Sequence, residues 1–225
     1  MPNTTSNSTN SQQLTILIID DHPLLLKGTI DLVQSRFSDA EIHSAQTAEE
    51  ALEQVKEQNP DLVIVDLSIP KAPGTNPHTD HGLGLLKELM ADYPGLNIII
   101  QSSTVQALIR LMPEIDNHQG GFTIADKSLP IETLLTRMEW AIQGLSYTKG
   151  LQKDLEVKPE WLEVLTLAFE EGLQDKAIAK TMYKSERMIR HYWSKIQDAL
   201  EVYPEEGKNM RVLTQIRARQ AGLID

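Results

Sequence analysis

The sequence predicts an α/β fold, a doubly wound sheet of five parallel strands, followed by a second, all-α domain. In residues 14–145, short apolar runs alternate five times with segments of helical periodicity. From residue 159 onward, every periodic segment is helical. Alternating strands and helices form right-handed βαβ units, so we expect a parallel sheet covered by helices on both faces.

The five expected strands are short runs of apolar residues: "LTILII" (14–19), "AEIHSA" (40–45), "DLVIVDL" (61–67), "LNIIIQS" (96–102) and "GFTIAD" (121–126). A helical pattern follows each of them, at 23–37, 47–58, 82–93, 104–117 and 130–144. Four further helices are expected at 159–172, 174–182, 185–200 and 209–222. Ser185 is a favourable N-cap for the third of these four, and Gly172 suits the end of the first.

These patterns divide the chain of 225 residues into four parts. Residues 1–12, "MPNTTSNSTNSQ", are polar and predict a disordered tail, because they lack the basic start and apolar stretch of a signal peptide. Residues 13–146 form the first expected domain, 147–157 a linker where the periodicity lapses, and 158–225 the second domain. The chain has no cysteine and no apolar window near the roughly 20 residues that span a bilayer. We therefore expect a cytoplasmic protein without a membrane segment.

The distribution of charge differs between the two expected domains. The net charge is -11 at pH 7, which argues against a nucleic-acid partner when taken over the whole chain. Residues 1–150 hold 9 Lys/Arg and 19 Asp/Glu, whereas residues 151–225 hold 12 and 13. The stretch 176–195 alone has six basic residues and one acid. The acidity therefore lies in the first domain, and the second carries a local basic patch.

Four of the expected strands end on side chains that can do chemistry. Asp20 and Asp21 follow the first strand, Asp66 the third, Ser102 ends the fourth, and Lys127 follows the fifth. Function in open α/β sheets gathers at this edge, where the carboxyl ends of the strands meet. Asp21 alone could simply cap the next helix. The five together favour Mg²⁺-assisted phosphoryl transfer, in which carboxylates bind the cation, one carboxylate attacks phosphorus, and an ammonium and a hydroxyl hold phosphoryl oxygens.

Over residues 14–145 the chain resembles the receiver domains of bacterial response regulators. The resemblance rests on "IIDDHPLLLKG", "DLVIVDLSIP", "IIIQSS" and "DKSLP", which occur in the family's order. It implies a flavodoxin-like receiver in which Asp66 is the phosphoacceptor. The Mg²⁺ ligands that it implies are Asp20, Asp21, Asp66 and the backbone carbonyl of Ser68, and the implied phosphoryl-binding side chains are Ser102 and Lys127.

Two departures from that family lie near the expected pocket. The loop "KAPGTNPHTDHG" (71–82) is longer than usual, and its His78, Asp80 and His81 form either a metal site or, as we favour, a solvated loop. Ile124 occupies the position where the family has a switching aromatic residue, and Phe122 is two positions away. The coupling of an aromatic rotamer to phosphorylation is therefore not expected here.

In the second domain, the helix expected at 185–200 is amphipathic. Ile189, Trp193 and Ile196 share one stripe, which predicts a core face. The opposite face is basic, so it predicts either a solvated helix or one that enters a DNA major groove. The segment from "VLTLAFEEGLQDKAIAK" to "AGLI" resembles the LuxR-type helix-turn-helix of the NarL/FixJ family. The DNA-contacting residues expected from the basic face and this resemblance are Lys176, Ser185, Arg187, Arg190, His191, Ser194 and Lys195.

Together these features predict a response regulator of the NarL/FixJ type and not an enzyme that turns over a substrate. We expect a histidine kinase or small phosphodonor to phosphorylate Asp66, and the protein to form a homodimer that binds double-stranded promoter DNA. One alternative is a receiver that serves as a protein-interaction module, with a tail that does not bind DNA specifically. Another is an aspartyl-phosphate hydrolase, which would show multiple turnover on organic phosphates.

Overall fold

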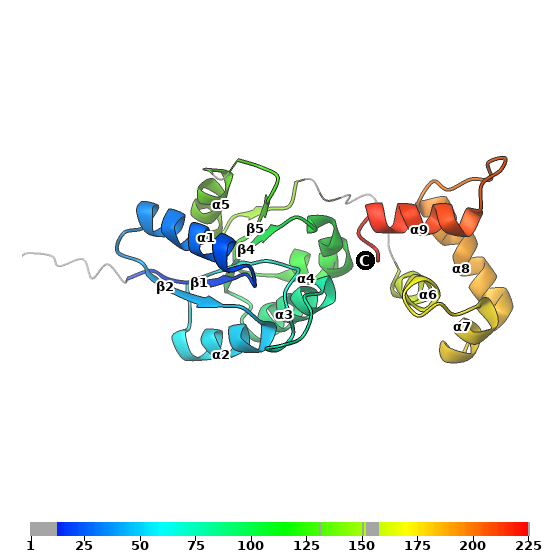
Figure 1. Ribbon diagram of the computed structural model, residues 1–225, viewed down its shortest axis with the longest axis horizontal. Coiled ribbons are helices and arrows are strands. Elements are labelled where there is room, and N and C mark those ends of the chain that lie inside the picture. The colour runs from blue at the N-terminus through cyan, green and yellow to red at the C-terminus, as the bar shows by residue number, and fades with distance from the viewer. Residues whose placement is uncertain (1–12, 131, 150, 152–157, 225) are drawn as a thin grey trace, which may run out of the picture.

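The computed structural model describes residues 13–130, 132–149, 151 and 158–224. The expected tail (1–12) lies outside these residues, as do residues 150 and 152–157 of the expected linker. A sheet with helices on both faces precedes a group of helices (Figure 1). No helix within the described ranges has the length and apolar character needed to cross a membrane.

The sheet has six parallel strands in the order β2-β1-β3-β4-β5-β6. Their bounds are β1 Thr15–Ile19, β2 Glu41–Ala45, β3 Leu62–Val65, β4 Asn97–Ser102, β5 Phe122–Asp126 and β6 Ser146–Tyr147. The expected α/β class and parallel sheet are confirmed, but the expected number of five strands is wrong. The sixth strand extends the β5 edge, where Thr123 is opposite Tyr147. Two residues are too few for a periodic pattern, and the packing of the Tyr147 ring against Arg137, 3.6 Å from the ring centroid, holds the strand in place.

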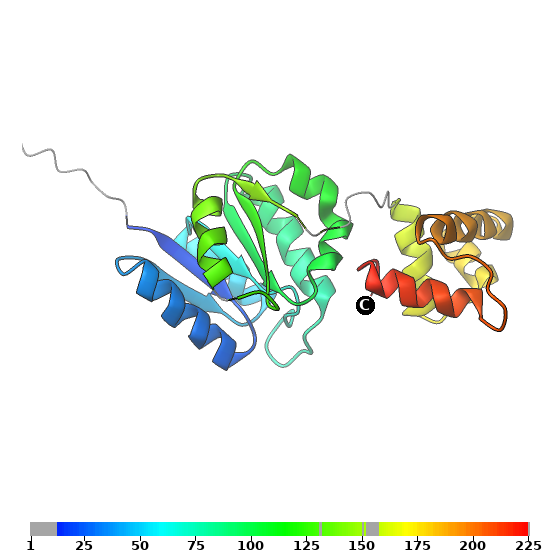
Figure 2. The same ribbon diagram turned by 90° about the horizontal axis from the view of Figure 1, so that it is seen from above.

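Helices cover both faces of the sheet (Figures 1 and 2). One core cluster packs α1 (Pro23–Arg36) and α5 (Glu132–Ile142) against one face. The other packs α2 (Ala48–Gln58), α3 (Thr79–Asp92) and the segment 105–117 against the opposite face. All four residues of β3 are buried, because both faces of this central strand are covered. Apolar side chains therefore fix the strand register, and with it the positions of the polar residues at the strand ends.

The segment expected as one helix at 104–117 is instead divided in two. Val105–Leu111 forms a 3-10 helix, η1, and Met112–Asn117 forms the short helix α4. Pro113 explains the break, since proline cannot donate to the carbonyl four residues earlier and its ring clashes with that carbonyl in a continuous α-helix. A 3-10 segment of this kind is typical of a hinge.

Two glycines of α3 lead to opposite predictions. A Cβ at Gly82 would lie 2.1 Å from the Leu67 carbonyl oxygen, whereas a Cβ at Gly84 would meet nothing within 4 Å. Gly82→Ala is expected to lower the free energy of unfolding by about 2 kcal/mol, because α3 must move away from the backbone that follows β3. Gly84→Ala should raise it by up to about 1 kcal/mol through helix propensity. Urea denaturation of both variants measures the difference, and equal effects at the two sites would contradict the close approach.

The C-terminal helices are α6 (Pro159–Phe169), α7 (Asp175–Thr181), α8 (Glu186–Ala199) and α9 (Met210–Gln220). Ile189, Trp193 and Ile196 of α8 are buried, which confirms the expected core stripe. The Trp193 indole donates to Asp175 Oδ1 at 3.1 Å, and the Arg211 guanidinium lies 3.4 Å from the Trp193 ring centroid. Arg211 Nη2 also contacts Asp175 Oδ1 at 2.6 Å. These contacts join α7, α8 and α9 into one unit.

Candidate functional site

Asp20, Asp66 and Lys127 meet at the carboxyl edge of the sheet. They follow β1, β3 and β5, and their side chains turn toward one another as each strand leaves the core. Lys127 Nζ contacts Asp20 Oδ2 at 2.8 Å and Asp66 Oδ2 at 2.6 Å. Both carboxylate side chains are only 5% exposed, so little solvent screens these two contacts. The structure thus joins residues that are 107 and 61 positions apart in the sequence.

The two carboxylates control the protonation of Lys127. Burial by itself lowers the pKa of the ammonium, because it penalises the charged form. Hydrogen bonds and charge from Asp20 and Asp66 outweigh burial, so the pKa of Lys127 is raised above its ordinary value of 10.5. Lys127 is therefore a cation throughout the physiological range of pH, and it is held by two acids at once.

Asp21 is not the N-cap of α1, so the capping interpretation of this residue is wrong. The N-cap is His22, whose backbone N–H donates to Asp20 Oδ1 at 2.8 Å. Asp21 Oδ1 is buried and accepts no hydrogen bond from any described residue. The His22 ring lies beside it, with Nδ1 2.9 Å from Asp21 Oδ1. Sequence analysis did not single out His22, although its position directly after the two aspartates was a signal.

The donor set at this edge fits a hard divalent cation. Ligand atoms of Asp20, Asp21, His22 and Asp66 lie within 4.8 Å of one another. Three of these residues offer carboxylate oxygens, which Mg²⁺ prefers. The oxygen of Asp21 that lacks a hydrogen bond is a buried acceptor that a cation would satisfy. The residues present therefore fit Mg²⁺.

Ser102 and Ser68 lie beside this cluster. Ser102 ends the neighbouring strand β4, is fully buried, and its hydroxyl contacts that of Thr104 at 3.2 Å. The backbone N–H of Ser68 donates to Asp66 Oδ1 at 3.2 Å, which fixes the turn after β3. Ile124 is buried in the core, 6% exposed, at the position expected for the missing aromatic residue.

The three polar residues of the long loop lie near one another, with His78 Nδ1 3.6 Å from Asp80 Oδ2 and the His78 and His81 ring centroids 5.7 Å apart, and they also contact neighbouring segments. His78 Nδ1 accepts from the backbone N–H of Asp80 at the start of α3, at 3.2 Å. Asp80 pairs with Arg110 of η1 at 2.7 Å, and His81 Nδ1 lies 3.2 Å from the Ile69 carbonyl oxygen. They form no metal-binding group within the part of the chain that the structure describes. The loop is instead tied to the sheet and to η1.

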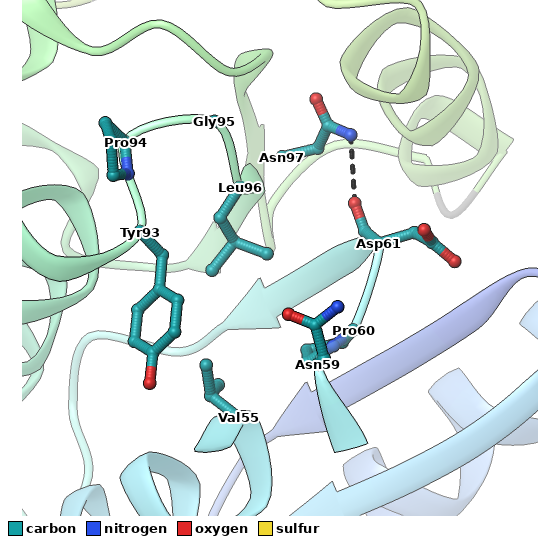
Figure 3. A pocket seen from close by; sticks show the side chains of 9 residues that line it. All are labelled: Val55, Asn59, Pro60, Asp61, Tyr93, Pro94, Gly95, Leu96 and Asn97. Carbon is teal, nitrogen blue, oxygen red and sulfur yellow. Dashed lines mark hydrogen bonds between the residues drawn. The ribbon is translucent and has the colours of Figure 1, made fainter. Parts of the chain in front are cut away.

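A cavity of about 330 Å³ lies at the opposite, amino edge of the sheet (Figure 3). Asn97 lines it, and its side-chain amide donates to the Asp61 carbonyl at 2.9 Å. Asn97 Oδ1 in turn accepts from the Gly121 N–H at 2.9 Å. These two hydrogen bonds join the starts of β3, β4 and β5. The Asn97 side chain therefore has a structural role in holding the strands together.

The outer face of the C-terminal helices carries the residues expected to contact DNA. All seven are exposed, on α7, at the N-cap of α8 or along α8: Lys176, Ser185, Arg187, Arg190, His191, Ser194 and Lys195. Ser185 is confirmed as the N-cap of α8, since its hydroxyl accepts from the Met188 N–H at 3.2 Å. One acid lies within this basic surface: Glu186 Oε2 is 3.9 Å from Arg190 Nη1.

Comparison with known proteins identifies a family match in the first part of the chain. Residues 16–112 match the response regulator receiver domain. The chain is 23% identical over 224 residues to the transcriptional regulatory protein DegU of Brevibacillus brevis, which covers 86% of this chain and 90% of that protein. It is 34% identical over 65 residues to the nitrate/nitrite response regulator protein NarL of Escherichia coli K12, which covers 29% of this chain and 30% of that protein.

A solved structure extends the likeness of fold to both parts. It is that of RcsB from Salmonella enterica serovar Typhimurium bound to promoter rprA in the presence of the phosphomimetic BeF3⁻. The TM-score is 0.59 at 21% identity, over 91% of this chain and 98% of that one. Residues 16–112 therefore match the response regulator receiver domain, and the chain is similar to transcriptional regulators of the DegU and NarL type.

Proposed function

We propose that the chain is a transcriptional regulator switched by phosphorylation of Asp66. The observation that carries this proposal is the bridge from Lys127 Nζ to Asp20 and Asp66, at the strand ends where the receiver family does its chemistry. A buried acid held within 2.6 Å of an ammonium is positioned for a reaction that adds negative charge.

In this proposal the Asp66 carboxylate oxygen attacks the phosphorus of a donor. The bond from phosphorus to the donor's leaving group breaks, and an acyl phosphate forms on Asp66. Asp20, Asp21, Asp66 and the Ser68 carbonyl would hold Mg²⁺, which supplies positive charge to the phosphoryl oxygens. Lys127 then turns from the carboxylate to the new phosphoryl oxygens, and the Ser102 hydroxyl donates to another. A histidine kinase is the expected donor, and small acyl phosphates are substitutes.

The helical domain would bind double-stranded promoter DNA through α7 and α8. Its seven exposed polar and basic residues offer phosphate contacts, and the N-terminal half of α8 would reach base edges in the major groove. Phosphorylation would favour a homodimer, which places two copies of α8 on half-sites about one DNA turn apart. The similar fold of RcsB, whose structure was solved bound to a promoter, supports this proposal. A regulator of this kind acts in the cytoplasm, where bacterial DNA lies.

Selection of genomic DNA fragments tests the proposal as a whole. Purified protein is treated with a phosphodonor and Mg²⁺ at near-physiological salt, alongside untreated protein and Asp66→Asn. Enrichment of a two-fold-symmetric site by the treated wild type, well above both controls, is the expected result. Equal enrichment by all three would refute the switch. If no sample enriches a site, the helical domain is not a specific DNA reader, and the protein-interaction alternative replaces it.

Lys195→Gln tests the basic face of α8 separately. Lys195 is half-exposed and 3.9 Å from Asp198, so its side chain can turn to a DNA phosphate. Loss of one phosphate contact should weaken binding to all sequences alike and reduce the slope of log K against log salt by about 1. Fluorescence anisotropy over a salt series gives the slope. Lys56→Gln, on α2 of the receiver, is the control, and an equal effect at both sites would contradict the assignment of this face.

A further inference from the structure

Arg137 of α5 is a buried arginine whose charge has no acidic partner. It is 8% exposed, and its Nε donates to the Ile124 carbonyl at 3.1 Å. Among the residues that the structure describes, no carboxylate forms an ion pair with it. The guanidinium groups of Arg110 and Arg211, by contrast, each contact an aspartate, at 2.7 and 2.6 Å. A buried arginine is almost never found without a partner, so Arg137 requires an explanation.

Two aromatic rings hold the Arg137 guanidinium in place without neutralising it. Its Cζ lies 4.4 Å from the Trp140 ring centroid and 3.6 Å from that of Tyr147. These cation–π contacts use the faces of the rings, and they leave the N–H groups at the edge of the guanidinium free to donate. Within the described part of the chain, only the Nε of this side chain has an acceptor. Both terminal nitrogens therefore remain as donors for a ligand.

A cavity of about 210 Å³ lies beside Arg137. Its apolar wall is formed by Val105, Ile124, Leu129 and Leu151. Lys149, which is exposed, adds a second cation to the lining. Asp126 adds an acid, whose Oδ1 already accepts from the Ser128 N–H at 2.8 Å. The cavity is smaller than the roughly 300–1,000 Å³ of pockets that take drug-sized ligands, so it suits a small one.

The identity of residue 124 explains why this space is open. Ile124 occupies the position where the receiver family has an aromatic residue, and its buried side chain lines the cavity. An aromatic ring at this position would extend into the space that isoleucine leaves empty. The departure from the family pattern therefore creates a cavity beside a buried, unpaired cation.

We propose that this cavity binds a small organic carboxylate with a compact apolar body. The carboxylate would accept hydrogen bonds from both terminal nitrogens of Arg137, and Lys149 would add positive charge from the solvent side. The apolar body would cover the aliphatic wall, which an inorganic anion would leave without a contact. Lys127 contacts Asp20 and Asp66 in the acidic pocket, so the carboxylate site is separate from that pocket and independent of phosphorylation.

Nuclear magnetic resonance of the isotope-labelled, full-length protein tests the site. The chain has three tryptophans, so three indole N–H signals report on different places. The probes are benzoate, hexanoate and inorganic phosphate, with benzamide as the neutral analogue of benzoate. Benzoate or hexanoate should shift the signal of Trp140, and not those of Trp161 and Trp193, with a Kd below about 1 mM. Benzamide should bind at least about tenfold more weakly, because it lacks the charge that pairs with the guanidinium.

Arg137→Met and Ile124→Phe remove the site in two different ways. Methionine keeps an apolar stem against the Trp140 and Tyr147 rings but removes the charge. Phenylalanine fills the cavity and leaves Arg137 unaltered, and the dispersed indole signals show whether each variant folds. Each substitution is expected to weaken the binding of the carboxylate probe at least about tenfold.

Arg36→Met is the matched control. Arg36 also lies near an aromatic ring, with its Cζ 5.9 Å from the Phe37 centroid, but it has Glu139 as an acidic partner. Its replacement should leave the affinity for the carboxylate within about twofold of the wild type.

Three results would overturn the proposal. One is the absence of a Trp140 shift with either carboxylate up to about 10 mM. Another is carboxylate binding that persists at full strength in both Arg137→Met and Ile124→Phe. The third is phosphate binding as tight as that of the carboxylates, which would show that Arg137 takes inorganic anions and that the apolar wall selects nothing.

Discussion

Asp66→Asn is expected to reduce labelling by a radioactive acyl phosphate in the presence of Mg²⁺ at least about 100-fold. The amide is nearly the same size as the carboxylate, but it lacks the nucleophilic oxygen that forms the acyl phosphate. Asp66 lies at the centre of the pocket, with Lys127 on Oδ2 and the Ser68 N–H on Oδ1, so the pocket holds it ready for attack. Acid-urea gel electrophoresis or intact mass spectrometry measures the labelled fraction.

Asp126→Asn is the matched control for this variant. Asp126 is also an aspartate at the end of a sheet strand, but its Oδ1 accepts from the Ser128 N–H at 2.8 Å outside the acidic cluster. Its replacement should leave labelling within about twofold of the wild type, since it touches no reacting atom. Persistent labelling of Asp66→Asn at the wild-type rate would move the acceptor to another residue, and peptide mapping would identify it.

The location of this pocket could be predicted because two simple rules determine it. Apolar runs identify the parallel strands, and parallel strands bring their carboxyl ends to one edge of the sheet. Asp20, Asp66 and Lys127 could therefore be expected to lie together without any knowledge of the contacts between them. This prediction did not require exact strand bounds. Strand β3 ends at Val65, two residues earlier than expected, and Asp66 still lies in the pocket.

The features that could not be predicted depend on contacts between distant segments. Strand β6 is held by Tyr147 against Arg137, and two residues carry no periodicity of their own. The 3-10 conformation of η1 depends on Pro113 and on the helical domain that packs against it. The bond from Arg110 to Gly222 spans 112 positions and joins two domains, so neither local propensity nor strand order indicates it.

Lys127→Met is expected to lower the free energy of unfolding by about 3 kcal/mol at pH 7 in the absence of Mg²⁺. Methionine fills similar space but leaves two buried carboxylates close together without a cation. Urea denaturation in the presence of a chelator measures this loss. Lys87→Met is the control, because Lys87 is exposed and lies 3.3 Å from Glu114, and its loss should change stability by less than about 0.5 kcal/mol. If Lys127→Met lost equally little stability, this would show that water stabilises the Asp20 and Asp66 carboxylates as well as the ammonium does.

Lys127→Met is expected to lower stability without Mg²⁺ but to raise the affinity of the protein for Mg²⁺. The lysine and the divalent cation neutralise the same carboxylates, so they compete in the wild type. Lys127→Met is therefore expected to bind Mg²⁺ at least about tenfold more tightly than the wild type, which corresponds to about 1.4 kcal/mol. Titration calorimetry gives both affinities directly. Weaker Mg²⁺ binding by the variant would mean that Lys127 orients the carboxylates for the cation and does not oppose it.

The dependence of this difference on pH follows from the direction of the Lys127 pKa. The pKa is raised in the folded protein, so the stabilising contribution of the ammonium is fully present below the ordinary value of 10.5. It is lost as the pH rises through the higher, folded value. Without Mg²⁺, the stability difference between the wild type and Lys127→Met should therefore stay constant from pH 7 to about pH 10 and then shrink. A difference that instead shrank between pH 7 and 9 would require a neutral Lys127 in that range. Such a result would contradict the double ion pair with Asp20 and Asp66 on which the proposed chemistry depends.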